Sequence, residues 1–262
     1  MTQDRSGDGG AGASPALRLV GLVKRFGEKT AVDHVDLVVP RGSFFGLVGP
    51  NGAGKTTTLS MAVGLLRPDG GSARIFGIDV WADPVAAKQL IGVLPDNLAM
   101  PERLTGRELL TYLGQLRGLD RATVAGRTQE LLEVLELTEA ERTVVIDYSA
   151  GMRKKITLAT ALLHTPMLLV LDEPFEAIDP VSAATIRAIL QRFVEAGGSV
   201  VMSSHVMALV EQLCDHVGVI ARGRLVASGT LDQVRGDGSL DDAFVRLVGA
   251  RINAEGLPWL AS

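Results

Sequence analysis

Short, mainly apolar runs, each bounded by glycine, proline or a polar residue, recur along this chain with helix-type patterns between them. Residues 44–48, 167–171 and 199–202 form such runs, and continuous apolarity is typical of parallel strands covered on both faces. Residues 18–23 and 35–39 also read as strands, and alternation in the second predicts a strand that is half-exposed. The succession of strand and helix patterns predicts an α/β fold.

The pattern changes between about residues 84 and 164, where strand-like runs disappear and Leu, Glu, Arg and Ala recur at helical spacing. Thr105 and Glu108 form a capping box ahead of an apolar helix at residues 109–116. Residues 121–137 predict a second, amphipathic helix. Four apolar side chains are expected on its buried side: Leu131, Leu132, Val134 and Leu135. We therefore expect a helical subdomain, residues 84–164, inserted into the α/β core.

Residues 217–227 predict a closing β-hairpin with its turn at Arg222 and Gly223. With this hairpin, the main domain is expected to span residues 16–238 and to begin with an antiparallel β-subdomain that contains the strand pattern at 35–39.

The two ends of the chain lie outside this domain. Residues 1–15 are rich in Gly, Asp and Ser and are expected to be disordered, because they hold too few apolar side chains to offset the entropy of ordering. Residues 239–262 predict one helix, at 241–248, and a loose tail. The N-terminus does not have the pattern of a secretory signal peptide. No apolar run approaches the roughly 20 residues that a membrane helix needs, so we expect the chain to serve any membrane from outside the bilayer.

The composition of the 262 residues is that of an ordinary soluble protein, with 47% hydrophobic and 21% charged residues. A net charge of −4 offers no broad basic surface, which argues against nucleic acid as a partner. The single cysteine, Cys214, cannot form an internal disulfide, which fits a reducing cytoplasm. It lies in an apolar stretch and is expected to be buried and inert.

Residues 49–56 read Gly-Pro-Asn-Gly-Ala-Gly-Lys-Thr and match the phosphate-loop pattern of nucleotide-binding proteins. A strand pattern before the loop and a helix predicted at residues 57–65 argue against an incidental glycine-rich turn. The glycines let backbone N–H groups point at phosphate oxygens, and the helix start adds partial positive charge. Lys55 would reach the β- and γ-phosphates of ATP, and the Thr56 hydroxyl would ligate Mg²⁺. The residues predicted to bind nucleotide here are Gly49, Pro50, Asn51, Gly52, Ala53, Gly54, Lys55, Thr56 and Thr57.

The apolar run at residues 167–171 ends in two acids, Asp172 and Glu173. A carboxylate at the carboxyl end of a buried parallel strand lies at the ligand-binding edge of an open α/β sheet. Asp172 supplies oxygen ligands of the kind that Mg²⁺ prefers. Glu173, which points the other way if the strand continues, would orient and deprotonate the attacking water. Two solvated acids are the alternative, and the phosphate loop upstream argues against it.

Residues 148–152, Tyr-Ser-Ala-Gly-Met, come just before a helix predicted at 155–163. They resemble the signature motif of the ABC ATPases, whose common form is Leu-Ser-Gly-Gly-Gln, with Ser149 and Gly151 retained. Three further residues fit motifs of the same family: Phe26 at the adenine-stacking position, Asp179 in the D-loop and His205 in the H-loop. The resemblance covers roughly residues 17–235 and identifies residues 16–238 as an ABC ATPase domain with a P-loop core.

The resemblance implies that two subunits bind head to tail, with each ATP held between one phosphate loop and the partner's Ser149 and the partner's Gly151. A serine hydroxyl and free N–H groups at a helix start do form an anion site, which supports this arrangement physically. Asp179 would link the two sites, and His205 would hold the γ-phosphate and the attacking water. The residues assigned to catalysis are Lys55, Glu173 and His205.

The chain departs from the family pattern at several positions. Asp96, which follows a strand read at residues 91–94, stands where the Q-loop usually has glutamine. A carboxylate can contact Mg²⁺ through water but cannot donate a hydrogen bond. Asp96 therefore joins Thr56 and Asp172 as an expected metal ligand. Ala150 replaces a signature glycine, and residues 176–178, Glu-Ala-Ile, replace a small-Gly-Leu run. Three basic residues are expected to form a solvated helix face: Arg153, Lys154 and Lys155.

This resemblance implies an ATP-hydrolysing subunit that powers an ABC transporter, and the layout favours a multicomponent exporter. The expected partners are a second nucleotide-binding subunit, in a homodimer, and an integral membrane permease that docks around residues 96–112. The chain would then be cytoplasmic, held on the inner face of the cell membrane by the permease. A soluble ABC-type ATPase and a nucleotide-gated scaffold that barely hydrolyses ATP remain alternatives. The sequence does not identify the cargo, because the permease would select it.

Overall fold

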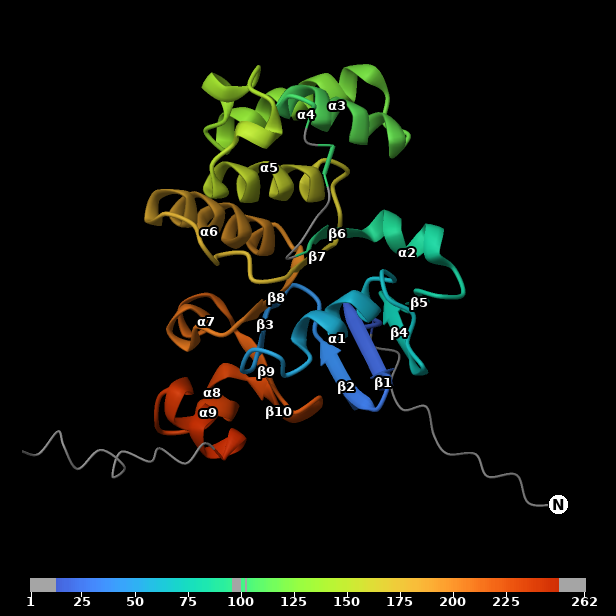
Figure 1. Cartoon of the computed structure of the whole chain (residues 1–262), viewed down its shortest axis with the longest axis vertical. Helices are drawn as coiled ribbons and strands as arrows, with labels where there is room; N and C mark the ends of the chain where they lie inside the picture. Colours follow the sequence, from blue (N-terminus) through green and yellow to red (C-terminus); the bar gives the residue numbers. More distant parts are fainter. Residues whose placement is uncertain (1–12, 96–99, 102, 250–262) are drawn as a thin grey trace, which may run out of the picture.

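An antiparallel sheet, a mainly parallel sheet and a group of helices form the part of the chain that the structure describes (Figure 1). This computed structural model describes residues 13–95, 100, 101 and 103–249. The predictions for residues 1–12, for Asp96 and for the tail at 250–262 lie outside the described residues. The predicted fold class is confirmed: an α/β core with an N-terminal antiparallel β-subdomain and inserted helices.

The antiparallel sheet has the strand order β2-β1-β4-β5. Its strands are β1 (Leu17–Phe26), β2 (Lys29–Val39), β4 (Gly70–Ile75) and β5 (Ile78–Asp79). Burial alternates along β1 and β2, so one face of this sheet packs on the core and the other meets solvent. The last two strands were not predicted, because β4 begins with two glycines and β5 has only two residues.

The larger sheet has the strand order β10-β9-β3-β8-β7-β6, and its strands from β9 to β6 are parallel. Its strands are β3 (Phe44–Val48), β6 (Ile91–Leu94), β7 (Leu168–Leu171), β8 (Ser199–Ser204), β9 (His216–Ala221) and β10 (Arg224–Thr230). The predicted hairpin is confirmed, because β10 pairs antiparallel with β9. Strands β3, β7 and β8 are buried at every position, as their continuous apolarity predicted.

The helical insertion stands at one end of the molecule (Figure 1). It contains α3 (Gly106–Leu116), α4 (Arg121–Val134) and α5 (Ala150–Leu162). Two 3₁₀ turns, Thr138–Ala140 and Val145–Asp147, connect α4 to α5. The segment from 84 to 164, where strand-like runs otherwise disappear, contains the strand expected at residues 91–94: this is β6, which pairs with β7 in the main sheet.

The capping box that starts α3 is confirmed: the Thr105 side chain accepts from the Glu108 N–H, and the Glu108 carboxylate accepts from the Thr105 N–H. The prediction for the buried side of α4 is wrong at Val134, which is 59% exposed. The buried face of α4 runs through Val124, Thr128 and Leu132, four residues apart, and position 134 points away from it.

The remaining helices surround the sheets. They are α1 (Lys55–Ala62), α2 (Pro84–Leu90), α6 (Pro180–Glu195), α7 (Met207–Leu213), α8 (Leu231–Arg235) and α9 (Leu240–Val248). The last of these confirms the helix predicted near the C-terminus. Within the described residues, none of the helices combines the length and the apolarity that crossing a membrane requires.

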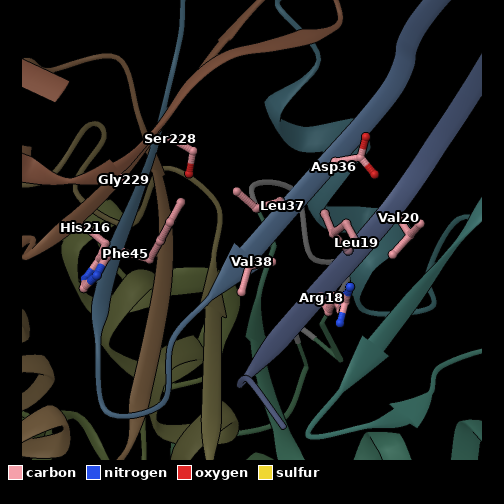
Figure 2. Close-up of a pocket in the computed structure, with 10 residues that line it drawn as sticks. All are labelled: Arg18, Leu19, Val20, Asp36, Leu37, Val38, Phe45, His216, Ser228 and Gly229. Carbon is pink, nitrogen blue, oxygen red and sulfur yellow. The ribbon is translucent and has the colours of Figure 1, made fainter. Parts of the chain in front are cut away.

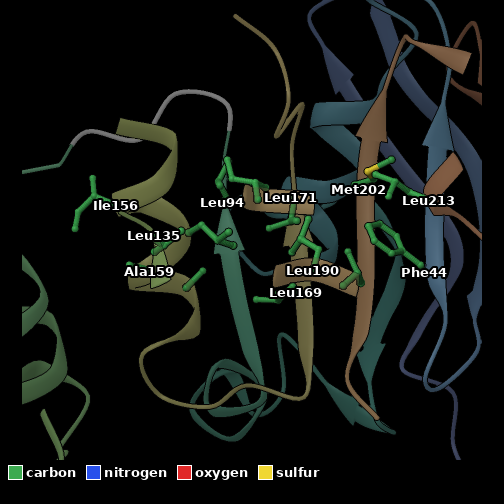
Figure 3. Close-up of a cluster of buried hydrophobic side chains, with 14 of the residues drawn as sticks. Phe44, Leu94, Leu135, Ile156, Ala159, Leu169, Leu171, Leu190, Met202 and Leu213 are labelled. Atoms are coloured by element: carbon green, nitrogen blue, oxygen red, sulfur yellow. The ribbon is translucent and has the colours of Figure 1, made fainter. Parts of the chain in front are cut away.

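Side chains of β3 point alternately to the two faces of the larger sheet and belong to two separate hydrophobic clusters. Phe44 and Val48 belong to a cluster that includes residues of α5, α6 and α7, part of which appears in Figure 3. Phe45 and Leu47 belong to the other cluster, beneath α1 and the antiparallel sheet. Because neighbouring strand residues point to opposite faces, the sheet is covered on both sides. Its parallel strands therefore present their carboxyl ends, and the loops that follow them, at one shared edge.

His164, just after α5, is a partly buried polar anchor between the insertion and the main sheet. Its ring Nε2 lies 2.8 Å from the Ile91 carbonyl oxygen and donates to it, since a carbonyl only accepts. Burial and the charge of Arg117 lower the pKa of His164 to about 4, so the ring is neutral in the folded protein at pH 7.

We predict that His164 makes stability depend on acidity. Between pH 6.5 and about 4 the unfolded chain binds the proton and the folded chain does not, so the free energy of unfolding falls as the pH falls through this window. The slope from one such group is at most about 1.4 kcal/mol per pH unit, less where solvent screens the ring. Urea unfolding at several pH values should therefore show that the free energy of unfolding depends less on pH in His164→Gln than in the wild-type chain. The exposed His34→Gln is the control, and an equal change in both variants would refute the assignment.

Candidate active site

The phosphate loop runs from the end of β3 into α1 with the tight backbone that its glycines predicted. Gly52 and Gly54 have φ angles of 77° and 107°, in the left-handed region that favours glycine. A Cβ on Gly54 would lie 2.5 Å from the Ala31 carbonyl oxygen, and one on Gly49 would lie 2.3 Å from that of Ile220. The loop is thus packed directly against backbone and cannot accept side chains at these positions.

Lys55 begins α1 and is only 6% exposed. Its Nζ donates to the Gly49 carbonyl oxygen at 2.8 Å and lies 3.3 Å from Oε1 of Glu173. The ammonium group therefore reaches back across the loop and ends beside the acids of β7. A buried cation beside a helix start favours an anion such as phosphate.

A cavity of about 430 Å³ opens over this loop. Eight of the predicted nucleotide-binding residues line it: Phe26, Pro50, Asn51, Gly52, Gly54, Lys55, Thr56 and Thr57. Glu173 lines the same cavity. The ring of Phe26 is exposed at one end, with the Lys24 Nζ 5.7 Å from its centre, and is open to stacking. The cavity therefore offers an aromatic face for a base and a glycine-rich cradle for phosphates.

The two acids after β7 are held by one hydroxyl. Ser203 Oγ on β8 donates to Oδ1 of Asp172 at 2.5 Å and accepts the N–H of Glu173 at 2.8 Å. Ser203 was not among the predicted site residues. A buried serine in an apolar strand two residues before His205 is a weak signal, because most such serines merely bond to nearby backbone.

Glu173 does not continue the strand. Its φ of 45° lies in the left-handed region, which costs a non-glycine residue about 1–2 kcal/mol. The expected strand alternation between Asp172 and Glu173 is therefore wrong, because β7 ends at Leu171. The turn aims Oε1 of Glu173 at Lys55 and places Oε2 3.1 Å from Nδ1 of His205. Lys55, Glu173 and His205, the predicted catalytic group, thus meet at one place.

The oxygen donors at this edge fit Mg²⁺. Asp172 is 5% exposed and accepts at Oδ1 from Ser203, so its second carboxylate oxygen is available to a cation. Asp172 and Thr56 line the same hollow of about 350 Å³. No cluster of three metal-ligating side chains occurs in the described residues. Mg²⁺ usually binds only a few protein side chains, and phosphate oxygens and water complete its coordination shell.

The signature residues lie apart from this cavity. Ser149 caps α5, where its side chain accepts from the Met152 N–H at 3.2 Å, and it is exposed. Asp179 caps α6 through the N–H groups of Val181 and Ser182. A Cβ on Gly151 would lie 2.7 Å from Ser182 Oγ and 2.8 Å from Asp179 Oδ2, so the starts of α5 and α6 touch. None of the three predicted residues, Ser149, Gly151 and Asp179, is among the residues that line the cavity over the phosphate loop.

The prediction of a solvated basic face on α5 is confirmed at Arg153, which is exposed, but is wrong at Lys155 and only partly right at Lys154, which is half-buried. Lys155 is 5% exposed, and its Nζ bonds to Oε2 of Glu136 at 2.9 Å. Lys154 Nζ donates to the Glu173 carbonyl oxygen at 3.0 Å, and Arg153 Nε donates to the Tyr148 carbonyl oxygen at 3.1 Å. Helix α5 contacts α3, α4, α6 and β6, so little of its surface is left for solvent.

Another hollow, of about 420 Å³, is lined by residues of β1, β2, β3, β9 and β10 (Figure 2). Apolar side chains such as Leu37 and Phe45 form part of its wall. Two of its polar side chains already have partners: Asp36 accepts from the Gly21 N–H, and the His216 ring bonds to Asp215. It shares no lining residue with the cavity over the phosphate loop, so it is not part of the candidate site.

Comparison with known proteins places these motifs in one family. The family described as "ABC transporter" matches residues 32–176. Over 240 residues the chain is 38% identical to the daunorubicin/doxorubicin resistance ATP-binding protein DrrA of Streptomyces peucetius, covering 92% of this chain and 73% of that protein. It is 36% identical over 214 residues to the bacitracin transport ATP-binding protein BcrA of Enterococcus faecalis, covering 81% and 68%. A solved structure described as "Structure of ATP binding subunit of ABC transporter" matches with a TM-score of 0.82 at 30% identity, covering 88% and 99%. The resemblance drawn from the sequence is confirmed.

We predict opposite effects for two glycine-to-alanine changes in helices. Gly151→Ala adds a Cβ between α5 and the side chains of Ser182 and Asp179, so urea unfolding should show a loss of about 1–3 kcal/mol. Gly126→Ala on α4 meets open space and should gain about 0.5–1 kcal/mol from helix propensity. Equal stabilisation by both changes would show that the starts of α5 and α6 are not tightly packed.

Proposed function

Because this chain belongs to the ABC transporter family as an ATP-binding subunit, we propose that it hydrolyses ATP to power a membrane transporter. The observation that carries this proposal is that Glu173 lies between Lys55, with which it lines the phosphate-loop cavity, and His205, which bonds to its second carboxylate oxygen. A nucleotide-gated scaffold would not need a base beside the phosphate site, so the cluster favours hydrolysis.

In the proposed reaction a water oxygen attacks the γ-phosphorus of ATP, and the bond from that phosphorus to the β–γ bridging oxygen breaks. Glu173 orients the water and takes its proton. His205, 3.1 Å from Glu173, holds the γ-phosphate and the water in line. Lys55 turns from Glu173 to the phosphates when ATP binds, which frees the carboxylate to act as a base.

We propose that Thr56 and Asp172 hold Mg²⁺ together with the phosphates of ATP. The ion, held by these two residues, would supply positive charge that offsets the negative charge of the phosphates. Asp96, the residue in place of the usual glutamine, would contact the ion through water. Phe26 would stack on the adenine, because its exposed ring lines the same cavity as the phosphate loop.

The second half of the phosphate site is proposed to come from another subunit, most simply a second copy of this chain. Ser149 is exposed at the start of α5, a place where a hydroxyl and N–H groups favour an anion. It is not among the residues that line this chain's own phosphate cavity, and neither is Gly151 beside it. A head-to-tail pair brings both residues to the partner's ATP, and Asp179, in contact with Gly151, joins the two sites.

We propose that the transporter is an exporter, and that the chain binds its permease at the cytoplasmic face of the membrane. The names of the relatives support this direction, because they include drug resistance, Nod factor export and bacitracin transport. These names favour a transporter over the soluble ABC-type ATPase. The hollow that contains Thr56 and Asp172 also has an apolar wall, with Leu65 61% exposed beside Val93 and Pro95. Such a wall suits an apolar helix of the permease, and its Pro95 directly precedes in sequence the segment 96–112 where docking is expected.

We predict that Glu173→Gln cuts the rate of ATP hydrolysis by about 10²–10⁴, because an amide cannot take the proton. Removing the negative charge should leave ATP binding intact and trap ATP-dependent dimers, measured by size-exclusion chromatography with light scattering. Lys88→Met, on the exposed surface of α2, is the control and should keep full activity. An unchanged rate in Glu173→Gln would overturn the assignment of the base.

We predict that Leu65→Asp separates the chain from its permease. An affinity-tagged chain should co-purify, in mild detergent, with a polytopic membrane protein encoded beside it, and Leu65→Asp should lose most of that protein. Val134→Asp, which places the same charge on an exposed apolar position of α4, should retain it. If wild-type chain captures no such protein, the soluble ATPase is favoured instead.

A further inference from the structure

The backbone of Glu173 is held from helix α5. Lys154 Nζ donates to the Glu173 carbonyl oxygen at 3.0 Å, although the two residues come from different parts of the domain. We propose that Lys154 is a positioning residue that fixes the general base of ATP hydrolysis. This inference rests on the proposed function, since it concerns the residue that takes the proton.

The conformation of Glu173 explains why it needs such a contact. Its φ of 45° is unfavourable for a residue with a Cβ, so the turn persists only if its surroundings hold it. Ser203 Oγ accepts the N–H of Glu173 at 2.8 Å, and Lys154 binds its carbonyl. The peptide groups on both sides of the Cα are therefore fixed. Fixing them sets the direction of the Cα–Cβ bond, and with it the place of the carboxylate.

Lys154 is suited to this task because the turn of α5 that carries it is anchored. The next residue, Lys155, is buried and bonded to Glu136, which anchors this turn of α5. An ammonium donor also makes a stronger hydrogen bond to a carbonyl than a neutral donor does. The Glu176 N–H reaches the same carbonyl at 3.2 Å, but it belongs to the same loop as Glu173 and cannot anchor that loop from outside.

The contact also connects the base to the signature helix. Gly151 and Lys154 are three residues apart and therefore neighbours on one face of α5. Gly151 packs against Asp179, and Lys154 binds Glu173, so this face contacts both ends of the loop between β7 and α6. Lys154 is not among the residues that line the nucleotide cavity. Its loss should therefore affect the placement of the base and leave nucleotide binding unchanged.

The test compares variants of Lys154 in the full-length chain with Mg²⁺ and ATP. Lys154→Met keeps the apolar stem but removes the donor, and kcat should fall about tenfold, since small misplacements of a catalytic group are costly. KM, and the Kd of a fluorescent ATP analogue, should stay within about twofold of wild type, because the cavity is intact. Lys154→Arg retains a charged donor and should recover most of the lost rate. Lys88→Met removes a lysine from an exposed helix surface and should change neither constant.

Each measured rate is divided by the measured fraction of chains that bind nucleotide. Partly unfolded protein in a preparation therefore does not lower the apparent kcat. If Lys154→Met does not fold, Lys154→Gln, with a shorter neutral donor, takes its place with the same expected loss of kcat. An unchanged kcat would overturn the proposal. A parallel loss of nucleotide binding, or failure of Lys154→Arg to recover the rate, would indicate a merely structural role and overturn the proposal as well.

If wild-type chain binds ATP but does not hydrolyse it, the proposed function itself fails and the positioning role falls with it. The two failures are thus distinguishable.

Discussion

The buried pair of Lys55 and Glu173 is the constraint on which the rest of the site depends. Removing both charges from water is costly unless each is matched by a partner and further hydrogen bonds. The Gly49 carbonyl accepts from the lysine, and His205 bonds to the second carboxylate oxygen of the glutamate. A nucleotide phosphate would compete for the same lysine. The pair therefore links Lys55, which would bind the phosphates of ATP, to Glu173, which would deprotonate water. Both side chains are poorly solvated, and charges interact strongly in such a place.

The fold brings these two residues together through strand order. The phosphate loop follows β3, the acids follow β7, and β8 between them in the sheet supplies Ser203 and His205. Because these strands are parallel, all three loops emerge at one edge. The two core clusters on opposite faces of the sheet hold this edge in place from both sides. Apolar packing remote from the chemistry thus sets the distances within the site.

Much of this could be predicted from the sequence, because the motifs are local. Glycines at Gly52 and Gly54 imply a left-handed loop, and two acids after an apolar strand imply a site edge. Ser203 and Lys154 could not be found in this way, since what distinguishes them is a contact across 30 and 19 positions of the chain. A run of three basic residues has the pattern of a solvated face. Only the packing of α5 against its neighbours reveals that Lys155 is buried.

The strained turn at Glu173 shows most clearly why local sequence patterns could not predict the backbone conformation at this residue. A strand pattern ending in acids gives no sign that the chain enters the left-handed region directly after Asp172. The turn is stable because groups from β8 and α5 bind its two peptide units, and those groups are distant in sequence. Helix α5 is thereby bound to the base at Lys154 and to the start of α6 at Gly151, while Ser149 at its exposed end remains free to meet an anion. A helix is stiff over one turn, so a shift at its exposed end must also act on the loop that holds Glu173. Such a helix can make the placement of the base depend on what binds at Ser149.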